Sequence, residues 1–203
     1  MKLLYNQGSP YARKVRVLIH ETGLAERVDM VDIGLLSPVA PSTDVVSSNP
    51  VGKIPTLIGD DGDAIYDSRV ICEFLDGLHA GPKLFPDRGA ARWRALTRQA
   101  LGDGLLDAAI IVRYENTLRP EEYRWTEWTA QQWEKVRRSL ERLEHEEVDR
   151  GEALDIGAIS IACALGYLDF RFAEEGWRDR YPKLAEWFAR VEQRPSMRAT
   201  VPA

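Results

Sequence analysis

Residues 2–23 read KLLYNQGSPYARKVRVLIHETG, and this stretch decides how the chain begins to fold. Residues 2–6 (KLLYN) are apolar and too short for a helix, so they predict a buried strand. Ser9 and Pro10 predict a helix start, because a hydroxyl suits the cap and a proline suits the first helical position. Gly23 stands where a helix C-terminal cap is expected. The chain therefore begins as a strand followed at once by a helix.

The next segments continue this alternation of short strands and helices. A second strand is expected at residues 27–33, two more at 56–58 and 64–66 with a tight turn between them, and a helix at 68–78. The residues at 34–48, rich in serine and proline, predict a loop. This order predicts a mixed sheet that opens with a right-handed crossover.

After this part of the chain the strand signals stop. Residues 79–86 (HAGPKLFP) are rich in glycine and proline and predict an interdomain linker. Helical patterns follow at about 88–118, 127–149, 155–174 and 182–193. We therefore expect an α/β domain at residues 1–79 and an all-helical domain at residues 87–203.

The composition is that of a globular protein and excludes several classes of function. Of the 203 residues 44% are hydrophobic, and 27 basic against 32 acidic residues give a net charge of −5. A protein that binds nucleic acid without regard to sequence is usually basic, so we expect no nucleic-acid partner. No apolar run approaches the roughly 20 residues that span a bilayer, and the first residues do not resemble a signal peptide. We expect a cytoplasmic protein with no membrane partner.

The cysteines and histidines predict neither a disulfide framework nor a metal site. Cys72 and Cys163 are far apart, lack CxxC spacing and stand among apolar residues. Buried, reduced thiols are the simpler interpretation, and they suit a reducing compartment. The three histidines show no metal-ligand spacing, so no metal is expected.

Three short segments have residues that suit binding, and each also has a purely structural interpretation. Ser9 at a helix N-terminus favours an anion such as a thiolate, or it simply caps the helix. Pro55 opens a strand, either at a sheet edge or after a cis bond that leaves the Ile54 backbone free to pair with an extended peptide. Asp67 and Ser68 either cap a helix or hold the amine and carboxylate of a ligand. No single segment decides between a structural and a binding role, and the order of the three along the chain is more informative than any one of them.

The combination resembles a bacterial glutathione S-transferase over nearly the whole chain. The matching segments are SPYARKVR (9–16), NPVGKIPTL (49–57), DSRVI (67–71), DGLLDA (103–108) and ALGYLD (164–169). The resemblance implies a thioredoxin-like N-terminal domain followed by an all-α helical bundle. It also implies glutathione as co-substrate, a small electrophile as second substrate, no metal and a homodimer.

The resemblance assigns a role to each residue of the three segments. Ser9 donates its hydroxyl hydrogen to the glutathione sulfur, and the Ile54 main chain pairs with the cysteinyl backbone next to a cis Pro55. Asp67 and Ser68 hold the γ-glutamyl amine and carboxylate. Lys53 is a weaker candidate for polar contacts to the peptide. Tyr11 and Tyr114 are loosely assigned to the pocket of the second substrate.

Two departures from the family pattern stand out. The acidic residue before Ser68 is usually glutamate, and the shorter Asp67 puts the strength of ligand binding in question. The helix near Asp155 usually starts with a Ser/Thr-x-x-Asp box, whereas here Ala158 takes the last position and cannot reach back to the cap. Asp155 still suits the cap itself.

The residue at position 9 separates this chain from some relatives and leaves others open. Thioredoxin-like redox proteins have a cysteine there, so Ser9 disfavours dithiol chemistry. Tyr5 is a rival partner for the thiolate, because some relatives use a tyrosine on the first strand. The remaining alternatives are another glutathione-dependent enzyme, such as an isomerase, peroxidase or dehalogenase, and a non-catalytic binding or regulatory protein.

Overall fold

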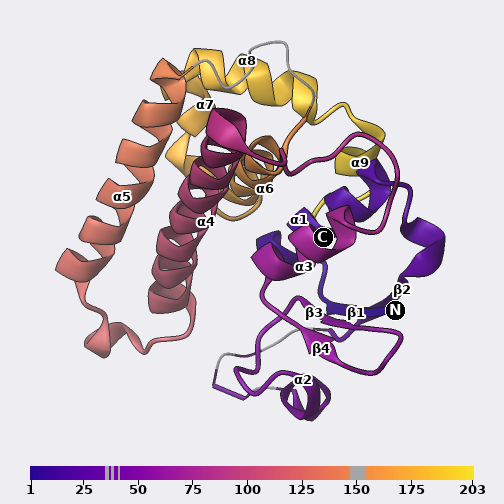
Figure 1. Ribbon diagram of the computed structural model, residues 1–203. Helices are drawn as coiled ribbons and strands as arrows, with labels where there is room; N and C mark the ends of the chain where they lie inside the picture. The colour runs from indigo at the N-terminus through magenta and orange to yellow at the C-terminus, as the bar shows by residue number, and fades with distance from the viewer. Residues whose placement is uncertain (35–36, 38, 41, 147–153) are drawn as a thin grey trace. The chain divides into compact units, whose positions relative to one another are not determined.

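The computed structural model describes residues 1–34, 37, 39–40, 42–146 and 154–203, which form two compact units (Figure 1). The first unit combines Met1–Arg92 with Arg194–Ala203, and the second is Trp93–Gln193. The second unit is therefore shorter at both ends than the helical domain expected at residues 87–203. The last ten residues, Arg194–Ala203, belong to the first unit.

A four-stranded mixed sheet forms the centre of the first unit, as the sequence predicts. The strands are β1 (Lys2–Tyr5), β2 (Asp29–Asp32), β3 (Thr56–Ile58) and β4 (Ala64–Ile65). Their order in the sheet is β2-β1-β3-β4. β1 is parallel to β2 and antiparallel to β3, and β3 is antiparallel to β4. With the helices of both units, this confirms the predicted α/β domain followed by an all-α part.

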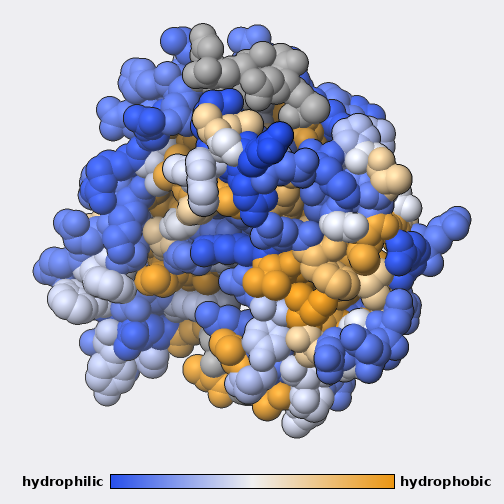
Figure 2. Space-filling model, viewed as in Figure 1, coloured by the Kyte–Doolittle hydropathy of each residue, from blue (hydrophilic) through white to orange (hydrophobic). Residues whose placement is uncertain are grey.

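Helices α1 (Pro10–Glu21) and α3 (Ser68–Asp76) pack against each other in this unit, and a 3-10 turn (Ala25–Arg27) follows α1. The fully buried Leu18 of α1 and Ile71 of α3 join the apolar strand residues in the core. On the other face of α3, Val70 and Phe74 are exposed, and apolar side chains gather over this helix in Figure 2. Val70 and Phe74 are therefore not part of the core of the first unit.

A six-residue helix, α2 (Thr43–Ser48), lies in the stretch predicted as a loop, so that prediction is wrong for these residues. Val45 is completely buried, and α2 contacts β3. Burial of one apolar side chain against the sheet thus favours a helical turn here. The serines and prolines nearby had indicated a loop instead. The predicted loop positions 35, 36, 38 and 41 lie outside the described residues.

Polar contacts to α1 explain why the last ten residues belong to the first unit. Glu21, the last residue of α1, accepts hydrogen bonds from Arg194 Nε at 2.9 Å and Nη2 at 2.7 Å. It also accepts one from the Ser196 hydroxyl, at the start of α9 (Pro195–Arg198). A bidentate pair of this kind fixes both groups in one plane. It anchors a short helix that is too small to be stable alone.

Two basic side chains of α1 add to this anchor. The buried Arg13 donates from Nη2 to the Met197 carbonyl oxygen at 3.2 Å. Arg16 donates from Nη2 to the Ala199 carbonyl oxygen at 3.4 Å. The arginines of the motif that follows Ser9 therefore hold the C-terminal segment in place.

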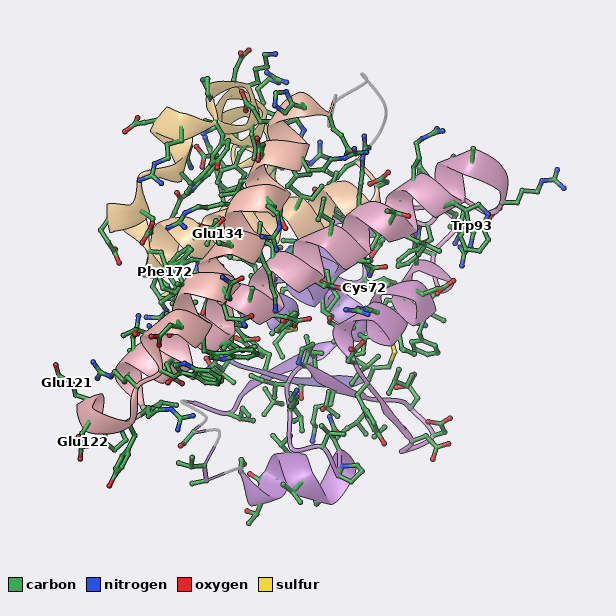
Figure 3. All side chains as sticks on the ribbon, turned by 90° about the vertical axis from the view of Figure 1, so that its left-hand side faces the viewer. Cys72, Trp93, Glu121, Glu122, Glu134 and Phe172 are labelled. Carbon is green, nitrogen blue, oxygen red and sulfur yellow. The ribbon has the colours of Figure 1, made fainter. Side chains whose placement is uncertain are left out.

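The second unit is entirely helical in the described part of the chain. Helix α4 (Gly89–Thr117) has its first turn in the first unit and its remainder in the second. It is followed by α5 (Thr126–His145), α6 (Ile156–Arg171), α7 (Trp177–Arg180) and α8 (Pro182–Val191), with 3-10 turns at Glu121–Tyr123 and Ala173–Glu175. The connection between α4 and α5 forms a protruding tip that carries Glu121 and Glu122 (Figure 3). The short α7 has no predicted counterpart, and positions 147–149 of the helix predicted at 127–149 lie outside the described residues.

Helices α4 and α6 run side by side in the same direction, and glycines allow the close approach. A Cβ built on Gly157 would lie 2.7 Å from the Ala95 carbonyl oxygen, and one built on Gly102 would lie 2.9 Å from the Ser160 carbonyl carbon. Contacts this short exclude any larger residue at either position unless the helices separate. Asp155 caps α6 as expected, accepting a hydrogen bond from Ala158 N at 2.8 Å.

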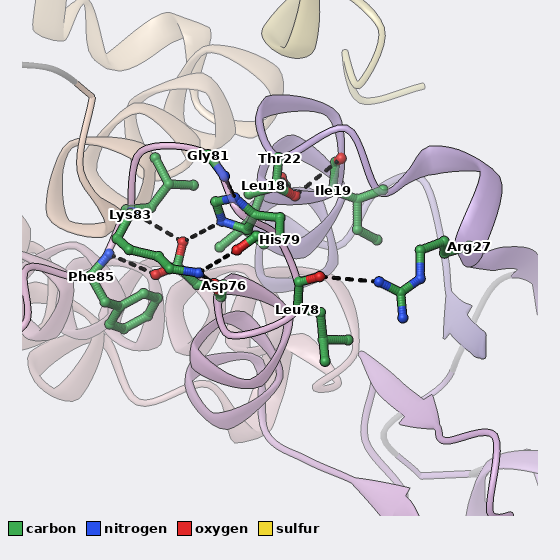
Figure 4. A network of polar contacts seen from close by, with 11 residues as sticks. Leu18, Ile19, Thr22, Arg27, Asp76, Leu78, His79, Gly81, Lys83 and Phe85 are labelled. Atoms are coloured by element: carbon green, nitrogen blue, oxygen red, sulfur yellow. Dashed lines mark hydrogen bonds and ion pairs between the residues drawn. The ribbon is translucent and has the colours of Figure 1, made fainter.

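The segment predicted as a linker is tied back to α3 by the buried carboxylate of Asp76 (Figure 4). This carboxylate accepts hydrogen bonds from the backbone N–H groups of Leu84 at 2.9 Å and Phe85 at 3.1 Å, and contacts His79 Nε2 at 3.0 Å. Lys83 Nζ reaches the carbonyl oxygens of Asp76 and His79, both at 2.6 Å. The linker therefore starts from a fixed position on the first unit.

Cys72 and Cys163 are buried and form no disulfide with each other, which confirms the prediction of buried, reduced thiols. Within the described ranges, no group of three or more His, Cys, Asp or Glu side chains is placed to hold a metal ion. No single helix there has the length and apolar character to cross a membrane, although the bent pair Ile156–Arg171 and Ala173–Arg180 meets the criteria of length and composition.

The contact between Glu21 and Arg194 predicts a pH-dependent stability. Hydrogen bonding to Arg194 lowers the pKa of the Glu21 carboxyl group below its usual 4.5, and Ser196 adds to this against the opposing effect of burial. A carboxyl group whose pKa is lower in the folded state stabilises the fold above its unfolded pKa, and this contribution disappears as the pH falls through the folded pKa. Glu21→Gln should therefore lower the free energy of unfolding by about 1–2 kcal/mol at pH 7.

Urea denaturation of the wild type and of Glu21→Gln, at neutral pH and at about pH 3, measures this difference. It should shrink at the acidic pH. The exposed Glu26 on the 3-10 turn after α1 supplies the matched control, and Glu26→Gln should change little at either pH. A wild-type advantage that is equal at both pH values would contradict the assignment to the charge of Glu21.

Candidate functional site

The three segments singled out in the sequence meet at one edge of the sheet in the first unit. β1 and β4 are each antiparallel to β3, so they point the same way (Figure 1). The end of β1, the start of β3 and the end of β4 therefore share one edge. Because Leu4 pairs with Thr56, residues just before Thr56 lie beside the segment that leads from β1 to Ser9. The segment after β4 that carries Asp67 starts from this same edge.

Ser9 is the N-cap of α1. Its backbone is extended (φ −80°, ψ 118°), and its Oγ accepts a hydrogen bond from Ala12 N at 3.2 Å. Pro10 occupies the first turn of the helix, as the sequence predicts. The half-buried hydroxyl uses a lone pair in this contact, so its hydrogen remains available for a second acceptor. The cap interpretation is confirmed, and it leaves the binding interpretation open.

The Ile54–Pro55 peptide bond is cis, and Pro55 is buried directly before β3. Among the described residues, neither the N–H nor the C=O of Ile54 pairs with another backbone group. Lys53 has an exposed side chain, and its carbonyl oxygen is turned back into the loop. A backbone with an open donor and acceptor beside a strand suits antiparallel pairing with an extended peptide.

Asn49 holds this turn in shape, a role that the sequence analysis missed. The buried amide donates from Nδ2 to the Lys53 carbonyl oxygen and to Thr56 Oγ1, both at 3.0 Å, and its Oδ1 accepts from Val51 N at 3.0 Å. Thr56 Oγ1 also donates to the Lys53 carbonyl oxygen at 2.9 Å. The signal in the sequence was an asparagine before a proline, which predicted a turn but not its side-chain contacts.

Asp67 caps α3, and its Oδ1 accepts a hydrogen bond from Arg69 N at 3.0 Å. The Tyr66–Asp67 peptide bond is cis. Asp67 is exposed, whereas Ser68 is buried, and the structure gives the Ser68 hydroxyl no hydrogen-bond partner among the residues it describes. With Ser9 this makes two helix N-termini at one sheet edge, each with a positive dipole end.

The tyrosines proposed from the sequence occupy three different places. Tyr5 ends β1 half-buried, and the guanidinium of Arg16 lies 4.9 Å from its ring centre. Tyr11 is in the first turn of α1. Tyr114, which is 42% exposed, is on α4 in the second unit. Tyr5 is thus engaged in a cation–π contact that does not use its hydroxyl.

Comparison with known proteins identifies the class to which this arrangement belongs. The model of the glutathione S-transferase N-terminal domain matches residues 8–78, and that of the C-terminal domain matches residues 126–190. The uncharacterized GST-like protein YibF of Escherichia coli (strain K12) is 31% identical over 206 residues, with 100% of this chain and 98% of the relative covered. The chain belongs to the glutathione S-transferase family.

Solved structures of relatives agree with this assignment. A glutathione transferase family member from Pseudomonas fluorescens Pf-5 with bound glutathione is 50% identical, with a TM-score of 0.97 over 100% of this chain and 98% of that one. A structure of a family member from the same strain with bound S-(propanoic acid)-glutathione is also 50% identical, with a TM-score of 0.92 over 100% and 99% of the two chains.

The role of Asn49 can be tested by removing its amide. Asn49→Ala removes the acceptor of the Val51 N–H and one of the two donors to the Lys53 carbonyl oxygen, inside a tight turn. We expect the free energy of unfolding to fall by about 2–3 kcal/mol. We also expect glutathione to bind at least about tenfold more weakly, because the Ile54 backbone is no longer held in place.

Calorimetric titration with glutathione and chemical denaturation measure both effects. Asn116 is exposed on α4, so Asn116→Ala is a matched control that should leave both quantities near their wild-type values. Unchanged affinity in a destabilised Asn49→Ala protein would show that Asn49 matters for folding alone.

Proposed function

We propose that the protein raises the thiolate population of bound glutathione and directs its sulfur at small electrophilic substrates. The observation that carries this proposal is the Ser9 hydroxyl at the N-terminus of α1, on the same sheet edge as the open Ile54 backbone and the start of α3. In the reaction, the thiol proton leaves to solvent and the sulfur forms a bond to an electrophilic carbon. That carbon then loses its leaving group or, in an addition, the atom that receives the displaced electron pair takes up a proton.

The energy required is within reach of these groups. A free thiol with a pKa near 8.5 is only about 3% ionised at pH 7, and lowering its pKa by two units takes roughly 2.7 kcal/mol. A partly buried helix N-terminus contributes ~1–2 kcal/mol. One hydrogen bond from the Ser9 hydroxyl to a thiolate contributes ~1.5–3 kcal/mol. Together they suffice without a general base, and positioning of the two reactants adds to the rate.

The other residues of the edge would hold the peptide part of glutathione. The Ile54 N–H and C=O would pair with the cysteinyl backbone, and Lys53 would add a polar contact. The Ser68 hydroxyl and the N–H groups that begin α3 suit the γ-glutamyl carboxylate, and the free oxygen of Asp67 suits the amine. Support comes from the relatives of 50% identity, whose structures hold glutathione and a glutathione with a substituent on sulfur.

The decisive experiment is calorimetric titration with glutathione from pH 5 to pH 9, in buffers of different ionisation enthalpy. Wild type should bind with release of a proton at pH values below the free thiol pKa. Ser9→Gly removes the hydroxyl yet changes cap stability by only a few tenths of a kcal/mol. It should release clearly less proton at neutral pH. Ser139→Ala, at a half-buried serine on α5 in the second unit, is the control.

Two results would overturn parts of the proposal. Absence of binding at millimolar glutathione would exclude the enzyme and favour a regulatory protein of the same fold. Proton release that is unchanged in Ser9→Gly but lost in Tyr5→Phe would move the thiolate contact to the rival tyrosine. A panel of electrophiles, peroxides and haloalkanes then separates a transferase from other glutathione-dependent enzymes at the same site.

The proposal extends to a cytoplasmic homodimer. The exposed Val70 (53%) and Phe74 (38%), one turn apart on α3, form an apolar face that suits a second copy of the chain. Light scattering should give twice the mass of the chain for the wild type and the single mass for Phe74→Asp. A wild-type monomer would contradict the proposed dimer.

A further inference from the structure

A cluster of cationic and aromatic side chains lies within the second unit, where α4 and α6 approach their C-terminal ends. The two helices run in the same direction, with Ala95 beside Gly157 and Gly102 beside Ser160. Farther along, α4 carries Arg113, and α6 carries Tyr167 and Arg171 one turn apart, on the same face. The charges of both arginines act on Tyr167, so the three groups form one cluster.

The positive charge of this cluster is not neutralised by the protein. The structure gives neither guanidinium an ion pair or side-chain hydrogen bond within the residues it describes. Burial lowers the pKa of Arg171, and the charge of Arg113 lowers it further. Two carboxylates that are close in sequence to these arginines form ion pairs with other residues: Glu115 pairs with Arg119, and Asp169 pairs with Arg178. Two neighbouring cations without a counterion favour binding of an anion.

Arg171 is held in a fixed orientation and has a donor without an acceptor. Its guanidinium carbon lies 3.7 Å from the centre of the Phe170 ring, a stacked arrangement that limits its freedom. Its Nε is buried and has no hydrogen-bond partner in the described part of the chain. A charged donor buried without an acceptor adds to the cost of holding this cation in the fold, and an anion paired with the terminal nitrogens of the guanidinium would offset it.

Tyr167 adds a neutral donor to the two cations. It is 4% exposed, and burial raises the pKa of its phenol to about 12, so the hydroxyl stays protonated at physiological pH. Phe172 packs against its ring at 6.3 Å between centroids, and Trp133 packs on Phe172 at 5.0 Å. These T-shaped contacts restrict the position of the Tyr167 ring. The exposed Tyr114 of α4 belongs to the same surroundings.

We propose that Arg113, Arg171 and Tyr167 bind the carboxylate of a small organic acid within the second unit. This inference goes beyond the proposed glutathione transfer and does not depend on it. A planar guanidinium donates two parallel hydrogen bonds to a carboxylate, and a phenol donates a third from another direction. A neutral molecule of equal size would leave the two cations of this cluster without a counterion.

The test is calorimetric titration, without glutathione, with two ligands of nearly equal shape, 4-chloro-3-nitrobenzoate and 4-chloro-3-nitrobenzamide. The wild type should bind the benzoate at least about tenfold more tightly than the benzamide. This ratio of affinities should fall towards one in Arg171→Gln and in Arg113→Gln, and partly recover in Arg171→Lys.

Arg180→Gln is the matched control, because Arg180 is exposed on α7, and its ratio should stay at the wild-type value. Equal affinity of the wild type for the two ligands, or a preference for the benzoate that neither arginine variant changes, overturns the inference and leaves the proposed function standing.

Discussion

The antiparallel position of β3 between β1 and β4 is the constraint on which the site depends. It makes β1 and β4 point the same way, so the helices that follow them start near one edge, and it brings the start of β3 to that edge as well. A shift of this pairing by one residue would turn every side chain of the strand to the opposite face. The fully buried Leu3 and Leu57, which pair across β1 and β3, oppose such a shift.

At this edge the groups that stabilise the fold are also the groups offered to a ligand. Ser9 and Asp67 each cap a helix through one oxygen, which leaves a hydroxyl hydrogen on the first and a second oxygen on the other. Asn49 satisfies the inward-facing groups of the turn and leaves the Ile54 backbone open. The choice between a structural and a functional role, which the sequence posed for each segment, is therefore not exclusive.

Local chemistry explains which features were predictable from the sequence. The side chains of Ser9, Asp67 and Asp155 suit the N-cap position, so these residues predict helix starts. Short apolar runs predict the strands. Contacts between distant residues left no such signal. Glu21 and Arg194 are separated by 173 positions, so the return of the C-terminus to the first unit was missed. The helix around Val45 depends on burial that only the folded sheet provides.

The same limit applies to the candidate sites. The three segments of the sheet edge were recognisable because each has its own turn or cap pattern. Arg113 and Arg171 are ordinary residues of two separate helical patterns, and only the packing of α4 on α6 brings them together. The roles of Ser9, Lys53, Ile54, Asp67 and Ser68 toward glutathione stay predictions, although the geometry of the edge suits them.

A crystal structure of the protein with glutathione would test the central claim most directly. The account predicts the sulfur within hydrogen-bonding distance of Ser9 Oγ, with the cysteinyl backbone paired to Ile54 and the γ-glutamyl carboxylate at the start of α3. A sulfur placed on the Tyr5 hydroxyl, or glutathione bound away from this sheet edge, would contradict it.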